Sequence, residues 1–284
     1  MLSKIRHQRP RRVPLRFTGS LGREIRGGLA RHSLPTVRYL SLQLPHLPAV
    51  WDGLKILQIS DVHAGPFAPI NRLRLIRRMA EGLDADLIVF TGDQLDRRAS
   101  DAEIFARGFQ GISAPLGVWG ILGNHDHATS TSLALESMIS AGIQPLVNQS
   151  VQLQREGVVL SLTGVDDLSS PGAGPDFSLI AKQEHSFRIC LCHQPEGWIE
   201  AAAQGAHLTL AGHTHGGQIA LTTRRLNVAR MATRYIAGPY RREDAFLYVS
   251  RGTGVGALPL RFGAPPEIDL LTLRTPAMYR PRVA

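Results

Sequence analysis

The sequence predicts an α/β protein, a sandwich of mixed β-sheets packed with helices. Strand-like and helix-like segments alternate in the first half of the chain, and the second half holds mainly strands, a combination typical of packed α/β layers. Short polar motifs follow several of the strand-like segments, at the ends where open α/β sheets gather their ligand groups. With 284 residues, 43% of them hydrophobic, the chain is long enough to bury one large core.

Four strands and two helices are expected in the first half. Alternating or continuous apolar residues predict strands, and apolar residues at three- and four-residue spacing predict helices. In the first helix Leu73 and Ile76 mark the apolar face, while arginines such as Arg74 and Arg78 point outward. The expected strands are 37–42, 54–60, 86–90 and 117–122, and the expected helices are 70–83 and 101–109.

One further helix and six strands are expected in the rest of the chain. The helix covers 132–140, and the strands cover 151–153, 158–163, 188–192, 207–210, 245–250 and 268–273. The only cysteines, Cys190 and Cys192, are two residues apart in one expected strand, so both face the same side without disulfide geometry. We expect two small buried thiols.

The positive charge of the chain is concentrated at its N-terminal end. Of 32 basic and 23 acidic residues, the first 38 positions contain ten basic residues and one acid, Glu24, which leaves 22 of each sign in the remainder. We therefore expect a basic, flexible tail at 1–35, a large domain at 36–276 and a C-terminal tail at 277–284. A domain without net charge lacks the broad basic face expected of a nucleic-acid-binding protein.

The N-terminal tail has two interpretations. Leu21, Ile25 and Leu29 recur at four-residue spacing beside arginines, which favours a surface helix in peripheral contact with an anionic membrane. The same composition fits a solvated, disordered tail. No run reaches the roughly eighteen apolar residues of a membrane span, and no signal peptide is evident. We expect a cytoplasmic protein, or one bound peripherally at the inner face of the membrane.

Five polar motifs that follow expected strands indicate a metal site. Each motif alone is compatible with a helix cap or a turn. Together they supply carboxylate, amide and imidazole donors, a set that favours Mn, Fe or Zn over a structural zinc held by thiolates. Two cations close together need a shared anionic bridge, which a single carboxylate such as Asp93 can provide. The motifs are Asp61-Val62-His63, Gly92-Asp93, Gly123-Asn124-His125-Asp126, His193 and Gly212-His213-Thr214-His215.

This ordered series resembles the motif string of the calcineurin-like metallophosphoesterases: D-x-H, GD-x-x-D, GNH[DE], a lone His and GH-x-H. The resemblance extends from about residue 37 to residue 273. The expected fold is a four-layer α/β sandwich, with two mixed β-sheets flanked by helices and the metal site at the carboxyl ends of the strands. By resemblance, one divalent ion is held by Asp61, His63, Asp93 and His215, and a second by Asp93, Asn124, His193 and His213.

The resemblance also implies the reaction. His125 protonates or polarises the leaving oxygen and Asp126 orients it, while a hydroxide that bridges the two metals attacks a phosphodiester or pyrophosphate bond. A nuclease or a phosphomonoesterase would use the same chemistry. A non-catalytic metal-binding scaffold is disfavoured, because all seven ligand positions and His125 are present.

Segments outside the ligands resemble a bacterial branch of this family that is linked to the membrane and envelope. That branch includes phosphodiesterases and a UDP-2,3-diacylglucosamine pyrophosphatase of lipid A synthesis, which implies a nucleotide-linked or lipid-linked substrate. Arg97, Arg224 and Arg225 are candidate substrate-binding residues, with solvated surface arginines as the alternative. The segments that carry this resemblance are 44–48, 51–61, 216–218, 249–254 and 265–268.

Overall fold

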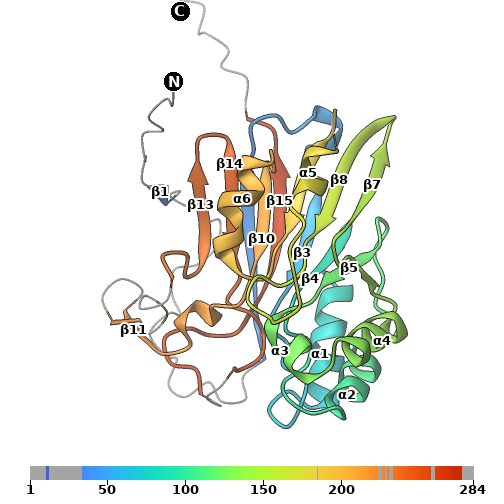
Figure 1. The fold of residues 1–284 in the computed structure, drawn as a ribbon, viewed down its shortest axis with the longest axis vertical. Helices are drawn as coiled ribbons and strands as arrows, with labels where there is room; N and C mark the ends of the chain where they lie inside the picture. The colour runs from blue at the N-terminus through green and yellow to red at the C-terminus, as the bar shows by residue number, and fades with distance from the viewer. Residues whose placement is uncertain are drawn as a thin grey trace, which may run out of the picture.

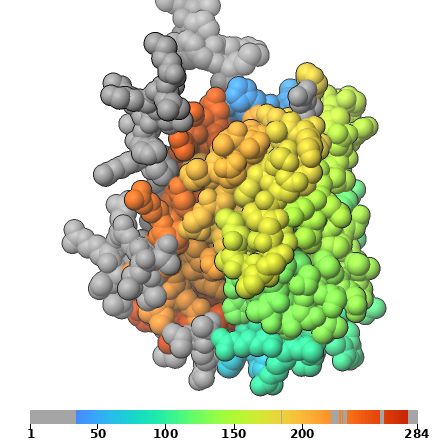
Figure 2. Space-filling model, in the orientation of Figure 1, coloured from blue at the N-terminus to red at the C-terminus, as the bar shows by residue number. Residues whose placement is uncertain are grey.

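The computed structural model describes residues 11–12, 34–183, 185–222, 226–227, 229, 233–256 and 260–276. Two mixed β-sheets of six and seven strands pack face to face, and helices cover the outer face of each (Figure 1). The first half of the chain, blue to green, and the second half, yellow to red, pack side by side into one body (Figure 2). The expected four-layer α/β sandwich is confirmed.

The six-stranded sheet has the order β2-β15-β3-β4-β5-β6. Strands β3 to β6 run parallel, while β15 is antiparallel to β3 and parallel to β2. The last strand of the chain therefore lies between the first two strands of this sheet. The strands are β2 (Thr36–Gln43), β3 (Lys55–Ile59), β4 (Leu87–Thr91), β5 (Val118–Ile121), β6 (Gln144–Pro145) and β15 (Glu267–Arg274).

Three helices cover the outer face of this sheet: α1 (Ile70–Glu81), α2 (Asp101–Phe109) and α4 (Thr131–Ala141). In β4, Ile88 and Phe90 face the helices, whereas Leu87 and Val89 face the second sheet. This alternation follows from the two-residue period of a strand. Because both faces are covered, the strand is apolar from Leu87 to Phe90, and all five of its residues, including the polar Thr91, are buried.

The seven-stranded sheet has the order β1-β13-β14-β10-β9-β8-β7. Strands β8, β9, β10 and β14 run parallel, and β1, β7 and β13 are antiparallel to their neighbours. Bounds are β1 (Arg11–Arg12), β7 (Gln149–Arg155), β8 (Val158–Gly164), β9 (Phe187–Leu191), β10 (Leu208–Ala211), β13 (Gly238–Arg242) and β14 (Ala245–Val249).

The outer face of the second sheet packs against α5 (Ser178–Ala181) and α6 (Trp198–Ala203). Cys190 and Cys192 are buried in this layer and free, as expected. Burial raises the pKa of both thiols, so neither is a reactive thiolate.

Every expected strand and helix has a counterpart, but several short elements were missed. Strand β13 contains Gly238 and Pro239, which are poor strand formers, and it is held by pairing with β14. The other missed elements are β1, β6, α3 (Asn124–Thr129), α5, α6, and the small pair β11 (Ala220–Thr222) and β12 (Leu226–Asn227).

The predicted terminal tails fall almost entirely outside the described residues. Within the N-terminal one, Arg11 and Arg12 form β1, which pairs with Arg241 and Tyr240 of β13. Residues 277–284 are also outside the described part. Among the residues that the structure describes, no helix has the length and apolarity that crossing a bilayer requires.

Candidate metal centre

All five motifs lie at one end of the sandwich, where the carboxyl ends of strands from both sheets meet. Below them, Gln58 Nε2 donates to Thr91 Oγ1 at 3.0 Å and to the carbonyl of Ala211 at 2.9 Å. This buried amide ties the two sheets together directly under the motifs. The first sheet contributes Asp61 and His63 after β3, Asp93 after β4 and Asn124 after β5, and the second contributes His193 after β9 and His213 and His215 after β10.

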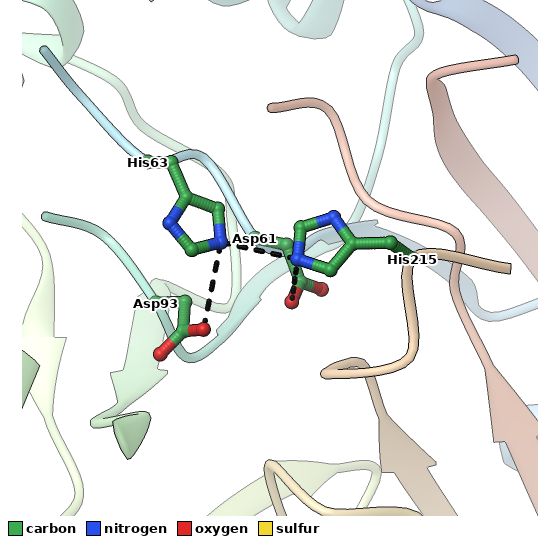
Figure 3. A group of neighbouring side chains, drawn as sticks. All are labelled: Asp61, His63, Asp93 and His215. Atoms are coloured by element: carbon green, nitrogen blue, oxygen red, sulfur yellow. Dashed lines mark hydrogen bonds and ion pairs between the residues drawn. The ribbon is translucent and has the colours of Figure 1, made fainter. Parts of the chain in front are cut away.

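Four side chains, Asp61, His63, Asp93 and His215, form a group that we call the buried cluster (Figure 3). The Nε2 atoms of His63 and His215 lie 3.1 Å apart. His63 Nε2 is 3.5 Å from Asp93 Oδ2, and His215 Nε2 is 3.4 Å from Asp61 Oδ1. None of the four is more than 8% exposed. One ligand atom from each lies within 4.8 Å of the others, close enough to surround one cation.

A second group, which we call the open cluster, consists of Asp93, His193, His213 and Asn124. His213 Nδ1 lies 3.0 Å from Asn124 Oδ1 and 3.3 Å from His193 Nε2, and His193 Nε2 lies 3.3 Å from Asp93 Oδ2. Asn124 and His213 are partly exposed, whereas His193 is fully buried. The structure thus brings together both residue groups that the motif resemblance implied, with Asp93 common to the two.

The hydrogen-bonding state of His193 shows that this arrangement fits a cation. Its Nδ1 lies 2.7 Å from the carbonyl of Thr91, an acceptor, so Nδ1 carries the hydrogen. In a neutral ring, Nε2 then presents a lone pair to the carboxylate of Asp93. Two acceptors at that distance repel unless a proton or a cation lies between them. Burial lowers the pKa of His193, but the carboxylates of Asp93 and Asp61 and the hydrogen bond to Thr91 outweigh it and raise this pKa to about 10.

Five of the expected ligand residues share the same strained backbone conformation, with positive φ. Asp61, His63, Asp93, His213 and His215 all have positive φ, between 47° and 68°, a region that costs side-chain-bearing residues about 1–3 kcal/mol each. Such strain persists only where the surrounding fold fixes it. The parallel strand ends do so here, because each sharp turn redirects a side chain from the strand end into the common centre.

Glycines of the motifs allow the turns to approach one another. A Cβ on Gly92 would lie 2.4 Å from Nδ1 of the His193 ring, and a Cβ on Gly123 would lie 2.2 Å from Asp93 Oδ1. Both distances are far inside van der Waals contact. The Gly-Asp and Gly-Asn pairs are therefore required by packing at the centre as well as by turn geometry.

His125 lies beside the buried cluster, and Asp96 fixes its ring. His125 Nδ1 donates to the carbonyl of Asp96 at 2.9 Å, which leaves Nε2 for another partner. The Asp96 carboxylate Oδ1 lies 3.9 Å from His125 Nδ1 and 3.6 Å from His63 Nδ1. Asp96 was not among the expected site residues, although it is the second aspartate of the GD-x-x-D motif, and that spacing was the available signal.

Asp126, which we expected to orient His125, makes its hydrogen bonds elsewhere. Its carboxylate accepts from the backbone N–H groups of Gln94 at 3.2 Å, Leu95 at 2.9 Å and Gly123 at 2.9 Å. Burial, together with the nearby charge of Asp93, raises the pKa of Asp126 to about 7. The contacts of Asp126 thus join the turns that carry Asp93 and Asn124, while the His125 ring is bonded to Asp96.

The three candidate arginines are not equally placed. Arg97 is 60% exposed beside Asp96, with its Nε 3.9 Å from Asp96 Oδ1, so it lies at the rim next to His125. Its backbone N–H donates to the carboxylate of Asp101, which also accepts from Arg98 N. Arg224 and Arg225 lie outside the described residues.

Comparison with known proteins adds independent information. Residues 54–217 match the family model of the calcineurin-like phosphoesterases. The uncharacterized metallophosphoesterase YkuE of Bacillus subtilis is 30% identical over 252 residues, 87% of this chain and 88% of that protein. A transmembrane protein with metallophosphoesterase domain from Bos taurus is 32% identical over 84% of this chain, which spans 57% of that protein. The UDP-2,3-diacylglucosamine pyrophosphatase LpxG of Chlamydia muridarum is 27% identical over 82% of this chain and 87% of that protein.

The family match covers more than half of the chain and contains all seven ligand positions. The chain therefore belongs to the calcineurin-like phosphoesterase family, and its reaction class is hydrolysis of phosphoric esters.

Proposed function

We propose that this phosphoesterase hydrolyses a phosphodiester or pyrophosphate bond with the help of two divalent cations. The observation that carries the proposal is the position of Asp93, whose Oδ2 lies 3.5 Å from His63 Nε2 in one cluster and 3.3 Å from His193 Nε2 in the other. When bound, such a pair of cations would acidify a water and neutralise charge on the phosphoryl oxygens. The mixed oxygen and nitrogen donors favour Mn, Fe or Zn.

We assign His125 as the proton donor to the leaving oxygen. Its Nδ1 hydrogen is committed to the carbonyl of Asp96, so the protonated ring can release a proton only from Nε2. Loss of that proton leaves a neutral imidazole with an unchanged orientation. The Asp96 carboxylate Oδ1 lies 3.9 Å from the same Nδ1. In this scheme Asp96 positions His125, and Asp126 holds the turns beneath.

The proposed substrate carries a nucleotide-linked or lipid-linked phosphate. Support comes from the similarity to LpxG, a UDP-2,3-diacylglucosamine pyrophosphatase, over most of both chains. Arg97 at the rim of the site, with Arg224 and Arg225, would bind further phosphate oxygens through planar guanidinium groups. A role in lipid A synthesis would follow if this substrate is the physiological one.

A substrate panel tests the proposal. Protein reconstituted with Mn²⁺ would be given UDP-2,3-diacylglucosamine, bis(p-nitrophenyl) phosphate, p-nitrophenyl phosphate and a single-stranded oligonucleotide, with Asp93→Asn as the blank. We expect hydrolysis of the pyrophosphate and the diester to exceed that of the monoester and the oligonucleotide. Preference for the oligonucleotide would favour a nuclease, and no hydrolysis above the blank would favour the non-catalytic scaffold.

We further propose that the N-terminal tail contacts an anionic membrane surface. The support is its charge, nine basic residues against one acid in positions 1–35. Cosedimentation with vesicles containing an anionic lipid would compare the full chain with an Arg23→Gln, Arg26→Gln, Arg31→Gln variant, which keeps β1 intact. We expect the variant to bind more weakly, and equal binding would contradict the proposal.

A further inference from the structure

We propose that Arg261 is a positioning residue for the buried cluster, and that it determines whether this cluster holds its cation. The inference rests on the two-cation site proposed above. Arg261 lies outside the recognised motifs, in the loop between β14 and β15. It is 1% exposed, one of the largest fully buried side chains of the described protein.

The burial of Arg261 calls for a reason, because a buried charge without a partner acid is costly. Within the described residues, no carboxylate forms an ion pair with its guanidinium, in contrast to Arg38 and Arg251, which both pair with Glu267. Burial lowers the pKa of Arg261 to about 10, which still leaves it charged at neutral pH. A leucine or methionine could fill such a space at lower cost, so the hydrogen bonds of the guanidinium are its distinguishing property.

These hydrogen bonds join two loops, the one between β14 and β15 that carries Arg261 and the one after β10 that carries His215. Nε donates to the carbonyl of Gly254 at 2.7 Å, and NH1 donates to the carbonyls of Ala264 at 3.2 Å and His215 at 3.4 Å. NH2 lies 3.0 Å from Nδ1 of the His215 ring. Arg261 therefore contacts both the backbone and the side chain of one ligand of the buried cluster.

Gly254 connects Arg261 to a second ligand, Asp61. The Gly254 N–H donates to the carbonyl of Asp61 at 2.7 Å, and Thr253 N donates to the carbonyl of Ser60 at 2.9 Å. A Cβ on Gly254 would lie 2.2 Å from the carbonyl of Val62, so this segment presses directly on the backbone that carries Asp61. One guanidinium thus holds His215 from one side and the support of Asp61 from the other.

Among the described residues, Arg261 makes no hydrogen bond to the open cluster. The connection is indirect, because the His213 N–H donates to the carboxylate of Asp61 at 3.0 Å. Asn124, His193 and His213 are held by other groups, such as the carbonyl of Thr91 for His193 and the neighbouring side chains of the cluster for His213. Loss of Arg261 should therefore affect the two clusters unequally. This asymmetry separates a positioning role from a general contribution to stability, which would affect both.

The contact between the Arg261 guanidinium and the His215 ring restricts the hydrogen-bonding state of that ring. A guanidinium can only donate, so Nδ1 of His215 accepts, whereas a metal-bound histidine usually donates its other N–H to an acceptor, which strengthens it as a ligand. If His215 Nε2 holds a cation and Nδ1 carries the hydrogen, the NH2 contact has to lengthen. The three hydrogen bonds from Arg261 to backbone carbonyls need not change, and these bonds fix the position of the loop that carries His215.

Metal content, measured independently of turnover, tests the inference. Arg261→Gln removes the charge and most of the donors, and Arg261→Lys keeps the charge but cannot reach all three carbonyls. We expect the ion of the buried cluster to bind about 10–100-fold more weakly in Arg261→Gln, the range for loss of a group that orients a metal ligand. Titration calorimetry with Mn²⁺ and metal analysis after gel filtration should then find about one retained ion per chain in place of two. The affinity of the buried cluster for its ion in Arg261→Lys should lie between those of Arg261→Gln and the wild type.

Arg38→Gln is the matched control. Arg38 is also largely buried, bonds to Glu267 and touches no ligand, so its loss should lower the melting temperature while two ions remain bound.

Double variants test the same assignment. Adding Arg261→Gln to His215→Ala should cause little further loss of metal beyond that of His215→Ala alone. Adding Arg261→Gln to Asn124→Ala should remove both ions. Two ions bound with wild-type affinity in Arg261→Gln, or equal weakening of both, would overturn the inference. Absence of hydrolysis by the wild type would contradict the proposed reaction without altering this result.

Discussion

The two ligand clusters differ in how far they are removed from solvent. The buried cluster contains two carboxylates and two imidazoles, none more than 8% exposed. The open cluster shares Asp93 but adds the partly exposed Asn124 and His213. The partly exposed Asn124 and His213, together with His125 and Arg97, mark the side from which we expect substrate to approach. The buried side supplies charge and rigidity, and the open side supplies access.

The largest effect is expected at the residue that both clusters share. Asp93→Asn keeps the shape of the side chain but removes the negative charge that lies opposite His63 and His193. Both ions should therefore be lost. We expect kcat/KM to fall by on the order of 10³-fold or more, as when a central electrostatic group is removed. Metal analysis and a diester assay would measure both. One retained ion would show that the clusters are more independent than their shared carboxylate indicates.

His125→Ala should come next, because it removes the proton donor and no ligand. We expect kcat to fall by about 10²–10⁴-fold with two ions still bound. Asp96→Asn, which keeps the backbone carbonyl bonded to His125, should have a smaller effect on kcat. A substrate with a good leaving group such as p-nitrophenolate should rescue both variants in part. Equal defects for good and poor leaving groups would argue against the proton-donor role.

Asn124→Ala separates the clusters most directly. The amide belongs to the open cluster alone and is partly exposed. Its loss should lower the affinity of the open cluster for its ion by roughly 10-fold to 100-fold, on the scale of other perturbed metal sites. The ion of the buried cluster should remain bound. Stepwise titration with Mn²⁺ would resolve the two events. Loss of both ions together would mean that the buried cluster cannot hold a cation by itself.

The strands and the ligands were predictable from sequence because both depend on local patterns. Strand β4 is apolar from Leu87 to Phe90, and the Gly-Asp turn begins one residue later, after Thr91. His193 was the weakest signal, a lone histidine, and resemblance to the family supplied it. Its position depends on β9 lying parallel to β10, a long-range pairing that no local pattern encodes.

The backbone contact of Asp96 with His125 and the role of Arg261 were not predictable for a similar reason. Asp96 holds His125 through its backbone carbonyl, and a carbonyl leaves no trace in residue identity. Arg261 lies 46 positions after the histidine that it contacts, beyond any local pattern. Its three carbonyl contacts come from loops whose proximity is set by the fold. Sequence identifies which side chains can bind a cation, and the topology decides which groups hold those side chains in place.

The smallest effect on the metal centre is expected at Asp269, a buried carboxyl of β15 outside both clusters. It accepts from Tyr248 Oη and Ser250 Oγ, each at 2.7 Å, and joins the two sheets. Burial, with the neighbouring Glu267, raises the pKa of Asp269 to about 7, against about 3.9 in an unfolded chain. The folded protein therefore binds a proton that the unfolded chain releases between these values, so this group's contribution to the free energy of unfolding falls as pH rises from about 4 to about 7.

Asp269→Asn should remove that pH dependence and leave metal binding unchanged. Its amide cannot ionise, so the variant should gain stability relative to the wild type, by on the order of 1 kcal/mol or more, between pH 5 and pH 8. Urea unfolding of metal-free protein at both pH values would measure the difference. Asp244→Asn, at an exposed carboxylate paired with His46, is the control and should leave the pH dependence as it is. If Asp269→Asn also lost an ion, metal retention would depend on the hydrogen bonds that Asp269 makes between the two sheets. The difference in metal binding between the two clusters could then no longer be attributed to their own ligands.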